Sequence, residues 1–303
     1  MKEKFEHRLE QAVGAERIFR EEPMKLHTTF RIGGPAQYLV APRTKEEVQE
    51  VVRLCREEGM PWYIIGNGSN LLVSDKGYRG VVIQLFKDFA DIRTEGTRIF
   101  ARAGASLAKI AAEALRNSLT GFEFAAGIPG TLGGACIMNA GAYGGEMKDV
   151  LESVTVLDGQ GDIRVLPREE LDMGYRTSRA AREGYIVLEA VIALEPGDES
   201  KIREKLEDLK ERLTSKQPLE YPSAGSTFKR PEGYFAGKLI QDAGLRGLRV
   251  GDAMVSEKHC GFVINCGSAT AADVDRLIRQ VQERVRENSG VTLEPEVKRL
   301  GEF

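Results

Sequence analysis

The stretch GFEFAAGIPGTLGGACIMNAGAYGGE, residues 121–146, is the most informative part of the chain. It holds eight glycines and five alanines around a single asparagine, and its only charged residues are two glutamates. A surface linker would be more polar, and a core helix would hold fewer glycines. Its centre, GIPGTLGG (127–134), is a tight path nearly free of side chains. A flat ring or an extended diphosphate could lie against it, although close packing of two backbones is the alternative that glycine also permits.

A second glycine-rich segment lies upstream, in IIGNGSNLLV (64–73), where a buried strand runs into GNGSN. Its glycines bring main-chain N–H groups close to a ligand, and its Ser and Asn add neutral donors that suit a diphosphate. It is not a Walker loop, which ends in Gly-Lys-Ser/Thr, nor the GxGxxG fingerprint, which would need glycine at Leu71. A glycine-rich turn between two strands is the alternative. Two such segments favour a ligand long enough to touch both, such as a dinucleotide.

The composition excludes several classes of protein. The 303 residues carry a net charge of −3, without the basic excess of a nucleic-acid binder, and the start, MKEKFEHRLEQ, indicates an amphipathic helix rather than a signal peptide. The longest apolar run, YIVLEAVIAL (185–194), is interrupted by Glu189 and is too short to cross a membrane. Four cysteines without CxxC spacing predict reduced, packed thiols, and three scattered histidines argue against a zinc site.

Along the chain, helical and strand patterns alternate, which indicates a mixed α and β protein of about three lobes. TKEEVQEVVRLCREEG (44–59) predicts a helix that Thr44 caps, with Glu47 completing a capping box. The same reasoning predicts a helix capped by Ser106, a hairpin over 152–166, a highly charged helix over 198–216 that marks a lobe boundary, and a final helix through Val274 and Val285 that Gly290 closes.

Seven segments, in this order, resemble one enzyme family. They are HTTFRIGGPA (27–36), IGNGSNLLVSD (65–75), GIPGTLGGACIMNAGAYGGE (127–146), YRTS (175–178), AGSTFKRP (224–231), SEKHCGFVIN (256–265) and LEPEV (293–297). Together they are similar to the UDP-N-acetylenolpyruvoylglucosamine reductases, the flavin enzymes that complete UDP-N-acetylmuramic acid in bacterial cell-wall synthesis. The likeness runs from about residue 23 to the end. The chain resembles the shorter form of the family, which lacks a tyrosine-bearing loop.

The resemblance implies an α+β chain with a FAD-binding fold of the p-cresol methylhydroxylase/vanillyl-alcohol oxidase type in two lobes, plus a C-terminal α+β substrate lobe. We expect an N-terminal helix (1–20), a FAD-binding domain (21–198, lobes of about 21–80 and 81–198) and a substrate domain (199–303) whose tail, 291–303, returns toward the active site. The implied non-covalent FAD contacts are Ile65, Gly66, Asn67, Gly68, Ser69, Asn70, Gly127, Ile128, Pro129, Gly130, Thr131, Gly133, Ala140, Gly141, Ala142 and Tyr143.

The family's reaction implies roles for three polar residues. NADPH first reduces the flavin and leaves; a hydride is then added to C3 of an enolpyruvyl ether and a proton to C2. Charge develops on C2 and spreads into the substrate carboxylate, so the site needs a partner for that carboxylate and a proton donor. Arg176 matches the carboxylate partner, Ser226 the proton donor, and Glu296 a second acid that a nearby carboxylate would push toward its protonated form.

The remaining substrate contacts implied are Tyr175, Lys216, Lys229 and Arg230, while the role of His259 stays open. We therefore expect a cytoplasmic, NADPH-dependent reductase of UDP-N-acetylglucosamine enolpyruvate in peptidoglycan precursor synthesis, with no metal, nucleic acid or membrane partner. A FAD-dependent oxidoreductase of the same fold acting on another small molecule is one alternative, against which the YRTS, GSTFKRP and LEPEV segments argue. A non-catalytic flavin- or nucleotide-binding protein is the other, and a bound flavin that NADPH cannot reduce would favour it.

Overall fold

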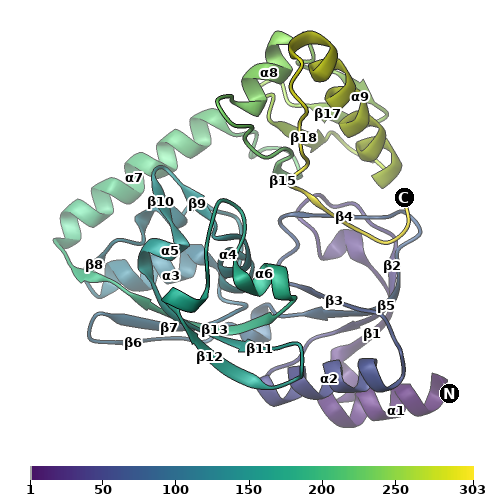
Figure 1. Cartoon of the computed structure of the whole chain (residues 1–303), viewed down its shortest axis with the longest axis vertical. Coiled ribbons are helices and arrows are strands. Elements are labelled where there is room, and N and C mark those ends of the chain that lie inside the picture. The colour runs from purple at the N-terminus through teal and green to yellow at the C-terminus, as the bar shows by residue number, and fades with distance from the viewer. Residues whose placement is uncertain (1) are drawn as a thin grey trace. The chain divides into compact units, whose positions relative to one another are not determined.

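The computed structural model describes residues 2–303 and divides into two compact units (Figure 1). The first unit contains the start of the chain up to Phe19, with Leu39–Asn67 and Val81–Leu213. The second contains Arg20–Tyr38, Gly68–Gly80 and Thr214–Phe303. Segments far apart in the sequence thus fold together within each unit. The predicted boundaries at residues 20 and 198 divide the chain by what each domain is expected to bind, and they stay a prediction.

The main sheet of the first unit is antiparallel. Its order is β12-β11-β13-β7-β6, with β6 (Ile92–Glu95), β7 (Arg98–Arg102), β11 (Leu151–Leu157), β12 (Ile163–Pro167) and β13 (Ile186–Ala193). Strands β11 and β12 form the predicted hairpin, which is confirmed. In its loop the buried Asp158 carboxylate accepts the N–H groups of Gln160, Gly161 and Asp162. This network of hydrogen bonds satisfies the turn and lowers the pKa of Asp158.

Among the described residues, six α-helices lie wholly within the first unit: α1 (Lys2–Val13), α2 (Lys45–Glu57), α3 (Leu107–Arg116), α4 (Leu132–Met138), α5 (Met147–Val150) and α6 (Arg179–Glu183). Helix α3 begins where predicted, because the Ser106 hydroxyl accepts the N–H of Lys109 at 3.3 Å. Helix α4 packs against β13 and α6. The glycine run therefore contains a helix that its composition did not predict.

Helix α2 confirms its predicted N-cap but not the predicted capping box. The Thr44 hydroxyl accepts the N–H of Glu47 at 3.1 Å, as expected. The Glu47 carboxylate instead accepts a guanidinium N–H of Arg17 at 2.6 Å and the main-chain N–H of Arg43 at 2.7 Å. A charged donor forms the stronger hydrogen bond. Arg17, which lies outside the helix, therefore binds the Glu47 carboxylate that the local pattern assigned to the capping box.

The remaining elements outside the C-terminal segment are short strands, 3-10 helices and one long helix. A four-stranded sheet of order β1-β2-β5-β3 contains β1 (Ile18–Pro23), β2 (Pro35–Val40), β3 (Trp62–Ile65) and β5 (Tyr78–Gln84), with β3 parallel to β5. Two-stranded pairs join β8 (Leu119–Thr120) to β14 (Glu195–Pro196) and β9 (Gly141–Ala142) to β10 (Gly145–Glu146). Five 3-10 helices are η1 (Ala15–Arg17), η2 (Met24–Leu26), η3 (Lys87–Phe89), η4 (Glu123–Ala125) and η5 (Arg168–Glu170). Helix α7 (Glu199–Lys216) is the predicted charged helix.

The second unit packs helices on a small antiparallel sheet. Its elements are β15 (Ser223–Ser226), α8 (Ala236–Asp242), β16 (Arg249–Val250), β17 (Ala253–Val255), β18 (Phe262–Asn265) and α9 (Ala271–Ser289), and the sheet order is β15-β18-β17-β16. Helix α9 starts with a capping box between Thr270 and Asp273. It ends at Gly290, whose φ of +73° confirms the predicted stop.

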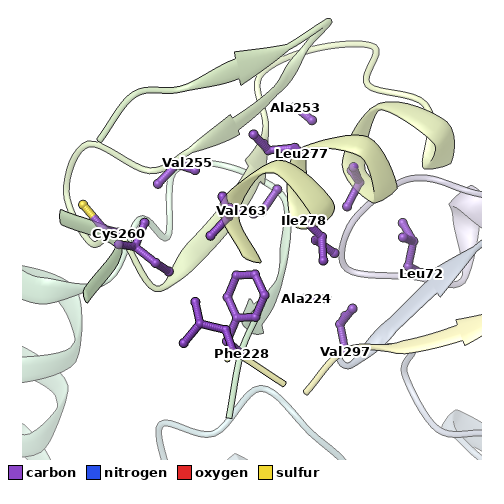
Figure 2. Packing of buried hydrophobic residues seen from close by; sticks show 14 of the residues in the cluster. Leu72, Ala224, Phe228, Ala253, Val255, Cys260, Val263, Leu277, Ile278 and Val297 are labelled. Carbon is purple, nitrogen blue, oxygen red and sulfur yellow. The ribbon is translucent and has the colours of Figure 1, made fainter. Parts of the chain in front are cut away.

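The core of the second unit anchors two segments that matter for function. Figure 2 shows Leu277 and Ile278 of α9 near Val263 of β18, in a cluster that also contains Phe228 and Val297. Phe228 comes two residues after Ser226 and is 3% exposed, and Val297, next to Glu296, is 5% exposed. Burial of these two apolar side chains therefore fixes the backbone beside both predicted acids.

The second unit also contains the strand that follows the GNGSN turn. Strand β4 (Leu71–Val73) pairs in parallel with β19 (Lys298–Leu300) of the C-terminal tail. The Asp75 carboxylate accepts the N–H groups of Ala271 at 2.8 Å and Ala272 at 3.0 Å, at the start of α9. The chain after the turn is thus fastened to the C-terminal elements at two points.

Candidate active site

In the first unit Gly66 and Asn67, which begin the GNGSN turn, lie beside the glycine run. The Asn67 side chain donates from Nδ2 to the Pro129 carbonyl at 3.1 Å. A Cβ built on Gly66 would lie 2.1 Å from the Thr131 hydroxyl oxygen, so only glycine fits there. A ligand that touches one segment can therefore touch the other.

The GNGSN turn contains main-chain donors that no protein group accepts. Its carbonyls are occupied, because Gly66 O accepts from the Gln84 side chain at 3.2 Å and Gly68 O from the Thr29 N–H at 3.3 Å. Within residues 2–303, the N–H groups of Gly66, Asn67, Gly68 and Ser69 donate no hydrogen bond to a protein acceptor. Four adjacent unsatisfied donors match what an anionic group such as the FAD diphosphate requires.

The sequence left open whether the glycine run packs against other backbone or lies against a ligand, and the structure contains a glycine suited to each. Gly133 is a packing residue, since a Cβ built there would lie 2.9 Å from the Ala103 Cβ. The N–H groups of Ile128 and Gly130 donate to carbonyls within the run, so any contact of these two residues with FAD would be made by other atoms. Gly134, in contrast, is exposed, and a Cβ built there approaches no atom closer than 4.0 Å. This open glycine lies in the path predicted for a flat ring, although it is not among the FAD contacts that the resemblance implies, and it suits a ring lying against α4.

The third predicted cofactor segment follows α4. Ala140 is buried and its carbonyl accepts the Met147 N–H at 3.0 Å. Gly141 and Ala142 form β9, and the hairpin turn places Tyr143 at a φ of +52° with 45% of its surface exposed. The segment offers main-chain atoms and one accessible aromatic ring.

Arg176 stands at the tip of a tight turn in the first unit. Gly174 and Thr177 exchange two main-chain hydrogen bonds, at 3.1 and 3.3 Å. Between them Arg176 has a φ of +55°, and its guanidinium carbon lies 5.3 Å from the Tyr175 ring centroid. A left-handed arginine is strained, and such strain is often retained where a side chain must point in one direction.

Ser226 ends β15 in the second unit and is exposed. Gly225, just before it, has a φ of +73°, and the pairing of β15 with β18 shifts register between Ser223 and Ser226. Thr227, just after it, is buried, donates its N–H to Gly261 O at 2.9 Å and accepts the Val263 N–H at 2.9 Å. The serine is therefore held between a bulge and a fully bonded neighbour.

Glu296 is joined to the Ser226 segment by the main chain. Its N–H donates to Thr227 O at 2.8 Å, and the next pair, Phe228 and Pro295, forms a β-bridge. Its carbonyl accepts from Asn70 Nδ2 at 3.3 Å, and Asn70 O accepts the Lys298 N–H at 3.0 Å. One unit thus holds both predicted acids and the last residue of the GNGSN turn.

The predicted substrate cations have different surroundings. Lys229 pairs with the Glu294 carboxylate, and the Arg230 guanidinium carbon lies 4.0 Å from the Phe235 ring centroid. Lys216 is exposed in the last turn of α7. These three residues belong to the second unit, whereas Tyr175 and Arg176 belong to the first.

Comparison with known proteins identifies the family of the chain and its domains. The profile of the UDP-N-acetylenolpyruvoylglucosamine reductase C-terminal domain matches residues 217–300, and that of a FAD binding domain matches residues 36–166. A protein of Alkaliphilus oremlandii named UDP-N-acetylenolpyruvoylglucosamine reductase is 54% identical over 285 residues, 94% of each chain. The protein of that name from Clostridium kluyveri is 52% identical over 300 residues, 99% of this chain and 98% of its own.

The chain belongs to the UDP-N-acetylenolpyruvoylglucosamine reductase family. The crystal structure of the family member from Thermus caldophilus superposes with a TM-score of 0.81 at 39% identity, covering 92% of this chain and 97% of that one. A berberine bridge enzyme variant superposes with a TM-score of 0.52 at 16% identity, covering 66% of this chain and 44% of that one, which shows the fold alone. The resemblance and the predicted FAD-binding fold are confirmed.

His259, whose role the sequence left open, supports the Ser226 segment in this family member. Its Nδ1 accepts the Gly261 N–H at 3.0 Å, and its ring meets the Phe262 ring edge-on at 5.1 Å. Burial lowers the pKa of His259, which keeps the ring neutral and Nδ1 available as an acceptor. Because Gly261 O accepts the Thr227 N–H, this ring steadies the backbone next to Ser226.

The four cysteines differ from reactive, catalytic thiols. Cys55, Cys136, Cys260 and Cys266 are free thiols, and burial raises the pKa of Cys55 and Cys136 to about 12. They are inert rather than nucleophilic. Among the described residues, no three His, Cys, Asp or Glu side chains could hold a metal ion together. Over that same range no helix has the length and apolar character needed to span a bilayer.

Proposed function

We propose that this chain reduces UDP-N-acetylglucosamine enolpyruvate to UDP-N-acetylmuramate, using NADPH and non-covalently bound FAD. FAD, when bound and reduced, supplies the hydride for C3 of the enolpyruvyl group. Membership of the family supports the proposal, and so do the four N–H donors of the GNGSN turn that have no protein acceptor. The observation that carries it is the hydrogen-bonded junction of the Ser226 segment, Glu296 and Asn70 in one unit.

Three residues of the chain donate the proton and stabilise the substrate carboxylate. The Ser226 hydroxyl donates the proton to C2, and because serine is a weak acid this step needs a fixed geometry. Arg176 binds the substrate carboxylate, which takes up charge as the proton arrives. Glu296, in its protonated form, donates a hydrogen bond to the same developing charge.

The substrate is a small molecule with an anionic diphosphate. Lys216, Lys229 and Arg230 supply positive charge in the second unit, and Tyr175 an exposed ring in the first. No nucleic acid or membrane is part of the proposed activity. A cytoplasmic location belongs to the proposal, because four free thiols are typical of a reducing compartment.

An anaerobic absorption titration of the purified, FAD-loaded protein tests the proposal. NADPH should bleach the flavin band, and UDP-N-acetylglucosamine enolpyruvate should restore it. Bleaching without recovery would point to another oxidising substrate on the same fold. A flavin that NADPH cannot bleach would point to a non-catalytic binding protein.

A further inference from the structure

Asn139 is a buried polar residue to which the proposed reaction assigns no part. It ends α4 inside the glycine run and is 1% exposed. Its backbone is left-handed, with φ of 44° and ψ of 56°, a conformation that asparagine adopts more readily than most residues. This explains how an asparagine fits there, but not why its side chain is buried.

The Asn139 side chain joins the end of α4 to two other segments, one containing Glu146 and Lys148 and the other Gly174. Nδ2 donates to Glu146 Oε2 at 2.8 Å and to Gly174 O at 3.0 Å. Oδ1 accepts the main-chain N–H of Lys148 at 2.9 Å. Both donor positions and the acceptor are therefore used, as a buried amide requires.

One of those segments is the turn that presents Arg176. Gly174 is the residue at which the turn starts, and Ser178, just beyond it, donates from Oγ to Ile137 O at 2.8 Å. The Arg176 turn is thus tied to α4 on both sides. With its left-handed tip, the turn has little freedom to reorient the guanidinium while these ties hold.

Glu146 connects Asn139 electrostatically to Arg176. Its carboxylate accepts from Asn139 and pairs with Lys148 at 2.8 Å. The hydrogen bond from Lys148 is the main reason that the pKa of Glu146 is lowered, and the Arg176 charge adds to it. The Glu146 carboxylate, which accepts a hydrogen bond from Asn139, therefore also interacts electrostatically with the Arg176 guanidinium.

We propose that Asn139 is a positioning residue that sets the direction of Arg176 toward the substrate carboxylate, through Gly174 and Glu146. This inference rests on the proposed function of Arg176. No other common residue replaces Asn139 fully. Aspartate keeps the shape and the left-handed backbone but cannot donate to Gly174 O, and it adds a like charge beside Glu146. Glycine keeps the backbone and loses every side-chain hydrogen bond.

The test compares Asn139→Asp and Asn139→Gly with a matched control, Asn265→Asp. Asn265 is also buried, donates from Nδ2 to Phe30 O at 3.2 Å, and accepts the N–H groups of Gly267 and Ala269. Each FAD-loaded variant is titrated with UDP-N-acetylglucosamine enolpyruvate while the oxidised flavin band is followed, which gives a substrate Kd without turnover. Melting temperature and the rate of flavin reduction by NADPH are measured alongside.

All three variants should melt below the wild type. Substrate Kd should rise about tenfold in both Asn139→Asp and Asn139→Gly, because each variant loses the hydrogen bonds to Gly174 O and Glu146. It should stay at the wild-type value in Asn265→Asp. Both Asn139 variants should still be reduced by NADPH, because the expected FAD contacts do not include the Asn139 side chain.

Lower melting with an unchanged substrate Kd in both Asn139 variants would overturn the inference, since the role would then be structural only. Failure of both variants to keep FAD would overturn it too and would assign Asn139 to the cofactor segment. Arg176→Ala separates these results from a failure of the proposed function. An unchanged Kd in that variant would remove Arg176 itself from the site, whatever Asn139 does.

Discussion

The bulge before Ser226 allows the placement of the proposed proton donor to be tested. Gly225 has a φ of +73°, and a Cβ built there meets no atom within 4 Å. Glycine is therefore needed at this position for its conformation and not for lack of space. A bulge of this kind redirects the side chain next to it, which here is Ser226.

Gly225→Ala should destabilise the protein by roughly 1–2 kcal/mol, the cost of holding an L-residue left-handed. No steric clash adds to this cost, because the space is open. Flattening the bulge would relieve the strain and would move the Ser226 hydroxyl. A displacement of about 1 Å can slow a reaction about 100-fold, so we expect reoxidation of the flavin by substrate to slow by about 10- to 100-fold. Reduction by NADPH should stay near the wild-type rate.

Gly244→Ala is the matched control. Gly244 also has a φ of +73° and an open Cβ position, and it belongs to the same unit. Urea unfolding should show a similar loss of stability in both variants, whereas stopped-flow absorption should show slow reoxidation only in Gly225→Ala. If the two variants lost equal stability and reoxidised equally fast, the bulge would not be what places Ser226.

Three further outcomes are expected. Ser226→Ala should leave NADPH reduction of the flavin near normal and slow its reoxidation by substrate by about 10²- to 10⁴-fold; two fast half-reactions in stopped-flow would exclude Ser226 as the donor. Gly134→Leu should melt higher as apoprotein, because leucine favours the helix, yet bind FAD at least about tenfold more weakly by fluorescence; unchanged FAD affinity would mean that the ring lies elsewhere. Because the pKa of His259 is lowered in the folded protein, the unfolded chain binds this proton more readily. The contribution of His259 to the free energy of unfolding is therefore present above its ordinary pKa of 6.5 and is lost as the pH falls below that value. His259→Asn, which can still accept the Gly261 N–H, should show a smaller fall in melting temperature from about pH 7 to about pH 5; an equal fall in both proteins would contradict this.

Local patterns predicted the elements that local interactions determine. The Ser106 cap, the hairpin around Asp158 and the Gly290 stop depend on neighbouring residues, and each is confirmed. Helix α4 was missed because Gly133 and Gly134 each disfavour a helix by about 1 kcal/mol. Packing of Gly133 on Ala103 and of α4 on β13 overrides that preference, and a sequence pattern shows neither contact.

The candidate site was predictable as a set of motifs but not as an arrangement. The family resemblance supplied Ser226 and Glu296, which read alone as a turn residue and a surface carboxylate. Their junction with Asn70 depends on a hydrogen bond between residues 226 positions apart, which no local pattern can indicate. The same holds for Asn139, whose bond to Gly174 spans 35 positions. In the sequence Asn139 is simply the only asparagine of the glycine run.

The surroundings of Ser226 fit the demands of a weak acid. A serine hydroxyl gives up its proton readily only to a basic acceptor at short range, so its rate depends on position more than on acidity. The groups on either side of it supply position: the Gly225 bulge, the fully bonded Thr227, and the neutral His259 ring that holds Gly261. A charged histidine would lose the Gly261 hydrogen bond, because both ring nitrogens would then be donors. Burial of the ring, by keeping it neutral, therefore preserves the geometry on which the proposed proton donation by Ser226 depends.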